Sequence, residues 1–119
     1  MAPLETAVNE LRQILSADST APEWRWNVRG RLSEVKDALS GPEARQADAW
    51  LAARAQCSDR VRHQLHARAT ILASGVLDKL DTATILQETQ RLLSDLERYV
   101  QRLHDLVYDS VSLELGGSE

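Results

Sequence analysis

The chain has 119 residues, 43% of them hydrophobic and 27% charged, a balance typical of one globular domain and not of a disordered chain. The formal net charge of −4 disfavours nucleic-acid binding, since such proteins need a basic face to displace counterions from phosphates. One cysteine, Cys57, excludes an intramolecular disulfide, and no apolar run approaches the roughly 18 residues of a membrane span. We therefore expect a cytoplasmic protein that does not enter a membrane.

Two short helices are predicted in the first third of the chain. The first covers residues 3–15, where apolar side chains recur every three or four positions. The second begins at Thr20, which has capping-box spacing to Glu23, with Pro22 in the first turn. Its apolar stripe consists of Trp24, Val28, Leu32, Val35 and Leu39.

Two longer helices are predicted in the remainder. A boundary falls at Ser40, again followed by a proline and by Glu43 at capping-box spacing. From there a third helix runs to Ser74, about 50 Å at 1.5 Å per residue, with Gly75 placed to end it at positive φ. The fourth begins at Asp81 or Thr82 and carries a regular stripe of Ile85, Thr89, Leu92, Leu96, Tyr99, Leu103, Leu106 and Ser110.

These elements predict one all-α domain over residues 1–119. Short connections make sequential helices antiparallel neighbours, so we expect an antiparallel four-helix bundle, with two short N-terminal helices packed on a long C-terminal helical hairpin. Residues 115–119 are expected to form a flexible tail. The hairpin is longer than either short helix, so part of its apolar face is expected to be covered by a second copy, giving a homodimer.

The sequence contains no recognisable catalytic motif. It lacks a glycine-rich phosphate loop and a Gly-x-Ser-x-Gly turn. Cys57 has no histidine one turn away on its helix, so we expect a buried, inert thiol, and Trp50 is expected in the core or at a dimer contact. His63 and His66 are expected to be solvated or salt-bridged, because no Glu precedes either by three residues. The chain is therefore interpreted as a non-enzyme without a cofactor.

A resemblance to a known family enters at the last predicted helix. Residues 101–109, with the sequence QRLHDLVYD, and the Leu-Gly-Gly at 115–117 resemble the last helix of small bacterial hemerythrin-like four-helix proteins. In that family a His and an Asp five residues apart contribute to a di-iron site, and His104 with Asp109 has that spacing. The other ligands have no counterpart, and an alternative register places the family's histidine on Tyr99. The resemblance therefore implies the fold with a degenerate metal site.

A partner-binding face is predicted on the second helix. Trp26 lies two residues from Trp24 and so points to a different side, near Arg25, Arg29 and Gly30. Trp and Arg dominate the binding energy of many interfaces, whereas the alternative is that Trp26 covers a neighbouring helix edge with Arg29 stacked on it. Gly30 costs a helix interior roughly 0.5 to 1 kcal/mol relative to Ala, so close packing or a ligand is expected there.

Three interpretations of function follow. The favoured one is a non-enzymatic interaction or regulatory module that self-associates through the hairpin and binds a protein partner at Trp26. The alternatives are a hemerythrin-like metal-binding bundle with a degenerate site, and a small-ligand-binding regulator with a cavity between the second, third and fourth helices. A nucleic-acid patch around Arg29 and Lys36 is not expected, since Glu34 and Asp37 interrupt it.

Overall fold

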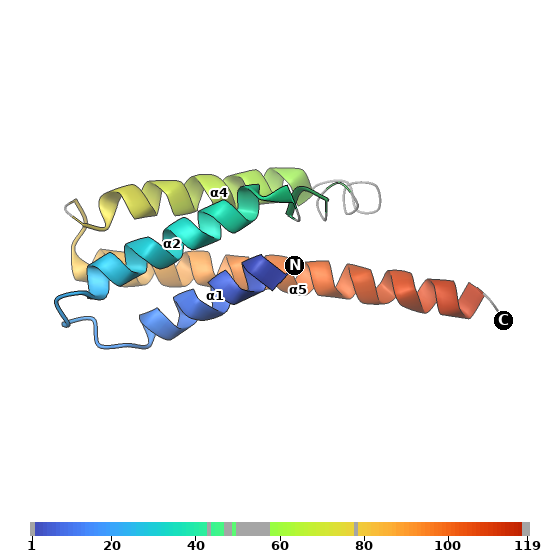
Figure 1. Cartoon of the computed structure of the whole chain (residues 1–119), viewed down its shortest axis with the longest axis horizontal. Coiled ribbons are helices and arrows are strands. Elements are labelled where there is room, and N and C mark those ends of the chain that lie inside the picture. Colours follow the sequence, from blue (N-terminus) through green and yellow to red (C-terminus); the bar gives the residue numbers. More distant parts are fainter. Residues whose placement is uncertain (1, 43, 47–48, 50–57, 78, 118–119) are drawn as a thin grey trace.

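The chain folds into helices. A computed structural model describes residues 2–42, 44–46, 49, 58–77 and 79–117 (Figure 1). The helices whose bounds fall within these residues are α1 (Ala2–Leu15), α2 (Trp24–Ser40), α4 (Ser58–Gly75) and α5 (Thr82–Gly117). No β-strand occurs in the described residues, which confirms the all-α prediction. The molecule measures 59 × 23 × 20 Å, and α5 continues past the ends of the other labelled helices (Figure 1).

The start of α2 differs from the predicted capping box. The helix begins at Trp24, and Glu23 at the N-cap position makes no side-chain capping hydrogen bond. Thr20 instead donates from its main-chain nitrogen and its hydroxyl to Asp18 Oδ1, at 2.9 and 2.6 Å. These hydrogen bonds lower the pKa of Asp18. The capping-box prediction is wrong because the Thr20 hydroxyl donates to the nearer Asp18 carboxylate and forms a local turn with it.

The boundary predicted after α2 is present. The Ser40 hydroxyl donates back to the main-chain oxygens of Lys36 and Asp37, at 3.3 and 3.2 Å. Helical backbone resumes at Pro42, and residues 44–46 and 49 are also helical. The rest of the connection to α4, including Glu43, Trp50 and Cys57, lies outside the described residues.

The end of α4 corrects the prediction for Gly75. This residue is the last of α4 and does not have positive φ. Its main-chain oxygen accepts hydrogen bonds from the nitrogens of Lys79 and Leu80, both at 3.1 Å. A Cβ on Gly75 would lie 3.2 Å from Leu80 Cδ1, so a close approach of Leu80, and not a left-handed backbone, accounts for the glycine.

The predicted start of α5 is confirmed. The Thr84 main-chain nitrogen donates to Asp81 Oδ1 at 3.2 Å, which makes Asp81 the cap of the helix. Hydrogen bonds from Thr84, through its side chain and then its main chain, lower the pKa of Asp81. The helix continues to Gly117, whereas Ser118 and Glu119 of the expected tail lie outside the described residues.

One apolar core joins α1, α2, α4 and α5. The helix α1 contacts α2 and α5, and α4 contacts the same two helices. The Trp24 indole nitrogen donates to the main-chain oxygen of Ile14 at 3.0 Å, which fastens the start of α2 to the end of α1. The predicted stripes supply the buried side chains, among them Leu4, Val8, Leu11, Trp24, Val28, Leu32, Val35, Leu39, Ile85, Leu92, Leu96, Tyr99 and Leu103.

Candidate functional site

Trp26 is an exposed aromatic side chain on the outer side of α2. Its exposed fraction is 61%, whereas Trp24, two residues earlier, is 1% exposed. The guanidinium carbon of Arg29 lies 5.5 Å from the centre of the Trp26 ring, within the range of a cation–π contact. The structure therefore brings together two of the four residues predicted for partner binding.

Arg25 lies elsewhere, at the connection between α4 and α5. Its Nη1 donates to the main-chain oxygens of Val76 and Leu80, at 3.0 and 2.6 Å, and its Nη2 donates to Thr82 Oγ1 at 3.2 Å. Carbonyl groups at the end of a helix lack intrahelical donors, and Arg25 supplies donors to this region. Its observed role is to hold α2 against the hairpin, so it does not join Trp26.

Gly30 lies on the exposed surface of α2, one turn after Trp26. No described atom lies within 4 Å of a Cβ built on this residue. The close helix packing considered for Gly30 is therefore not found in the described part of the chain. The main chain of α2 is open to a partner at this point.

The predicted metal residues are described only in part. His104 is half exposed, with 53% of its side chain accessible, and it pairs with Glu5 on α1. The Asp109 side chain lies outside the described residues. His63 is exposed and lies 3.1 Å from Arg62 Nη2, while His66 is half-buried. Across the described residues, no three His, Cys, Asp or Glu side chains converge as a metal site would require.

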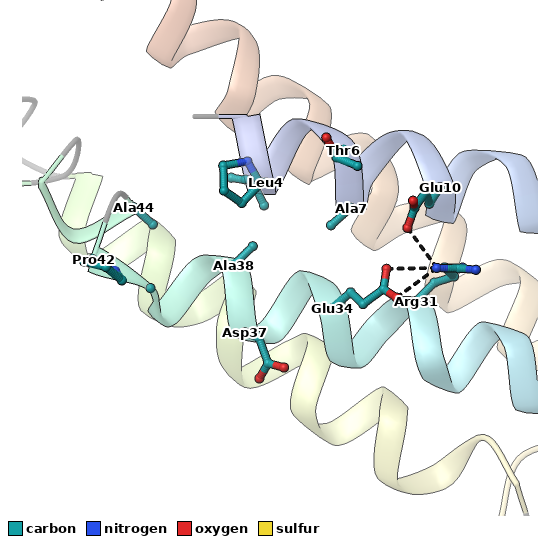
Figure 2. A pocket seen from close by; sticks show the side chains of 12 residues that line it. Leu4, Thr6, Ala7, Glu10, Arg31, Glu34, Asp37, Ala38, Pro42 and Ala44 are labelled. Atoms are coloured by element: carbon teal, nitrogen blue, oxygen red, sulfur yellow. Dashed lines mark hydrogen bonds and ion pairs between the residues drawn. The ribbon is translucent and has the colours of Figure 1, made fainter.

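A groove that sequence reasoning missed lies between α1 and α2 (Figure 2). Its volume is about 800 Å³. One end is polar, and the remaining wall is largely apolar. The lining residues are Pro3, Leu4, Thr6, Ala7, Glu10, Arg31, Glu34, Asp37, Ala38, Gly41, Pro42 and Ala44. The position differs from the cavity between the second, third and fourth helices that the sequence suggested.

Two carboxylates share one guanidinium at the polar end of the groove (Figure 2). Arg31 Nη1 lies 2.8 Å from Glu10 Oε2, and 2.9 and 3.0 Å from the two carboxylate oxygens of Glu34. A hydrogen bond with Glu34, together with burial and the Glu34 charge, raises the pKa of Glu10. The same hydrogen bond lowers the pKa of Glu34.

Only one of the two ion pairs in this cluster could be predicted from the sequence. Arg31 and Glu34 have the three-residue spacing of an ion pair on one helix, whereas Glu10 comes from α1. The pairing of Glu10 with Arg31 depends on how α1 and α2 are aligned, and local sequence patterns do not encode this alignment.

No known protein family, no curated protein and no solved structure matches this chain. None of the helices within the described ranges combines the length and the apolar character needed to cross a membrane.

Proposed function

We propose that this protein is a non-enzymatic interaction or regulatory module that binds a protein partner through the Trp26 face. We define this face as Trp26, Arg29 and Gly30 of α2. The observation that carries the proposal is the 61% exposed indole of Trp26, with Arg29 lying against it. We further propose that the module acts in the cytoplasm, in keeping with a sequence that holds one cysteine.

The chemistry of this face favours protein binding. Burying a large apolar side chain contributes about 2 kcal/mol, and tryptophan and arginine are enriched among the residues that dominate interfaces. The contact with Trp26 restricts Arg29 before binding, so less conformational entropy is lost when a partner arrives. The open surface at Gly30 lets a partner approach the α2 main chain closely.

We also propose that the four helices form an antiparallel bundle. On α2, Arg25 reaches Val76, just after α4, while the Leu39 main-chain oxygen accepts a hydrogen bond from Arg62 near the start of α4 at 3.0 Å. Residues near the start of α2 thus lie beside the end of α4, and residues near the end of α2 lie beside the start of α4. The same inverse order holds between α1 and α2, for Glu10 with Arg31 and Ile14 with Trp24, and between α1 and α5, for Glu5 with His104 and Arg12 with Glu97.

Self-association through α5 is the second part of the proposal. The helix α5 has 36 residues, so its length is about 54 Å. His104 pairs with Glu5, near the first residue of α1, and the α5 backbone continues for another 13 residues to Gly117. The sequence stripe also continues past this point, at Leu106 and Leu113. These features favour a homodimer, and a monomeric mass by native mass spectrometry at micromolar concentration would contradict it.

The test of the Trp26 face is a quantitative affinity capture from extract of the cells that make the protein. Three baits are compared: wild type, Trp26→Ala and Ile71→Ala. Ile71 is the matched control because it is an apolar side chain on α4 with a 70% exposed fraction. We expect one protein to be enriched by wild type and by Ile71→Ala, and lost with Trp26→Ala. Equal enrichment by all three baits would contradict the proposal.

The hemerythrin-like alternative rests on its sequence resemblance. Its test is metal analysis of protein purified without a histidine tag, in which substoichiometric iron, zinc and manganese would contradict it.

A further inference from the structure

The groove between α1 and α2 exists because small side chains face each other across the two helices. Ala7 on α1, Ala38 on α2 and Ala44 after α2 all line it, together with the buried side chain of Leu4. An alanine leaves unfilled the space that leucine would occupy in a closely packed interface. The resulting volume of about 800 Å³ lies within the usual range of small-molecule sites.

The charges at the groove are unbalanced. Two carboxylates, those of Glu10 and Glu34, meet one guanidinium, that of Arg31, whereas the Asp37 carboxylate points away from α1 (Figure 2). Arg31 uses the same nitrogen, Nη1, for both glutamates, so one positive charge serves two carboxylates. The side chains of Glu10 and Glu34 are 38% and 47% exposed, which leaves them accessible to a second cation.

We infer that this groove binds a small amphipathic organic cation, with an ammonium or guanidinium head beside Glu10 and Glu34 and a hydrocarbon body along Leu4, Ala7 and Ala38. The charge complementarity selects this class of ligand. An anion would meet the two carboxylates of Glu10 and Glu34, and a neutral compound would leave the excess negative charge unpaired. A cation without a hydrocarbon part would not use the apolar wall, which supplies most of the available binding free energy.

This site is separate from the Trp26 face. None of Trp26, Arg29 and Gly30 lines the groove, so a small ligand and a protein partner have different binding surfaces on α2. The two proposals therefore fail independently. Trp26→Ala is expected to leave cation binding unchanged, and a change in that variant would overturn the separation of the two sites.

The test is calorimetric titration at neutral pH and low salt with n-octylammonium as the probe. We expect saturable binding of one molecule per chain. Two controls change one feature each: n-octanoate reverses the charge of the head, and ethylammonium keeps the single ammonium head but lacks the long hydrocarbon tail. Both are expected to bind at least about tenfold more weakly. Comparable binding of either control, or no binding of n-octylammonium, would overturn the inference.

Variants locate the binding within the protein. Glu34→Gln is expected to weaken binding roughly fivefold, as suits a partly exposed ion pair. Glu88→Gln is the matched control, since Glu88 also pairs with an arginine three residues away, on α5. Ala38→Leu fills the groove and is expected to abolish binding. If Ala38→Leu disturbs the fold, Thr6→Phe narrows the groove from an exposed position instead. Unchanged affinity in Glu34→Gln or in the folded groove-filling variant would overturn the inference.

Discussion

Arg25 Nη1 lies 2.6 Å from the main-chain oxygen of Leu80, which ties the second residue of α2 to the connection between α4 and α5. The same nitrogen reaches the main-chain oxygen of Val76 at 3.0 Å. One side chain thereby holds three helices in place at this end of the molecule. The exposed pair Trp26 and Arg29 lies on the adjoining turn of α2. Arg25 therefore fixes the position of the part of α2 that carries this face.

Replacing Arg25 is expected to destabilise the protein. Arg25→Met keeps an unbranched side chain but removes every donor, leaving the carbonyl groups of Val76 and Leu80 without this partner. The expected loss in the free energy of unfolding is about 1 to 3 kcal/mol, measured by urea denaturation. Arg29→Met is the control, since Arg29 is exposed and is expected to change stability by less than about 0.5 kcal/mol. Equal losses in both variants would contradict the role assigned to Arg25.

Thr89 is a polar residue in the apolar stripe of α5. Its side chain is fully buried, and its hydroxyl oxygen has no hydrogen-bond partner in the described part of the chain. Thr89→Val replaces the hydroxyl by a methyl group of similar shape and is expected to raise the free energy of unfolding by about 1 kcal/mol. The comparison is with Thr70→Val, because Thr70 is exposed and its hydroxyl donates to the His66 main-chain oxygen at 2.9 Å. A lower melting temperature for Thr89→Val would show that the hydroxyl has a stabilising partner.

Local sequence patterns predicted most of the core but not every helix end. The stripes of α1, α2 and α5 and the Asp81 cap depend on residues a few positions apart, which a linear pattern records. Thr20 shows the limit of this reasoning, because Asp18 competes for the same hydroxyl. Gly75 shows another, since its close neighbour Leu80 lies beyond the end of the helix.

The site was predictable only where one helix supplies it. Trp26 and Arg29 are three residues apart on α2, so their shared exposed face follows from helical geometry. Arg25 and Glu10 each reach a different helix, and the identity of those partners depends on tertiary alignment. For this reason the sequence indicated neither the hydrogen-bond partners of Arg25 nor the groove.

The cap at Asp81 predicts a specific pH dependence. Because the pKa of Asp81 in the folded protein lies below its ordinary value of 3.8, the ionised carboxylate stabilises the fold above that value. This contribution is lost as the pH falls through the lowered pKa. Asp81→Ala is therefore expected to be less stable than wild type at neutral pH, and the difference is expected to shrink on acidification below about pH 4.

Glu23→Ala is the matched control for this cap, since Glu23 occupies the same position on α2 without a side-chain capping hydrogen bond. Denaturation curves from neutral to acidic pH measure both variants against wild type. A stability difference for Asp81→Ala that stays constant to pH 2 would contradict a cap that acts through the ionised carboxylate.

Gly30 connects stability with binding at the Trp26 face. Because nothing lies within 4 Å of its Cβ position, Gly30→Ala is expected to raise the free energy of unfolding by roughly 0.5 to 1 kcal/mol. The added methyl group lies where the partner is proposed to approach, so partner capture is expected to fall. Higher stability with undiminished capture would remove Gly30 from the face, while Trp26 and Arg29 would remain in it.

The most direct test of the central claim is photo-crosslinking in the cells that make the protein, with p-benzoylphenylalanine in place of Trp26. The same group in place of Ile71 on α4, which is similarly exposed, is the control. The account predicts a discrete crosslinked protein from position 26 that is absent from position 71. Crosslinks of the same kind from both positions, or none from position 26, would contradict a binding face at Trp26.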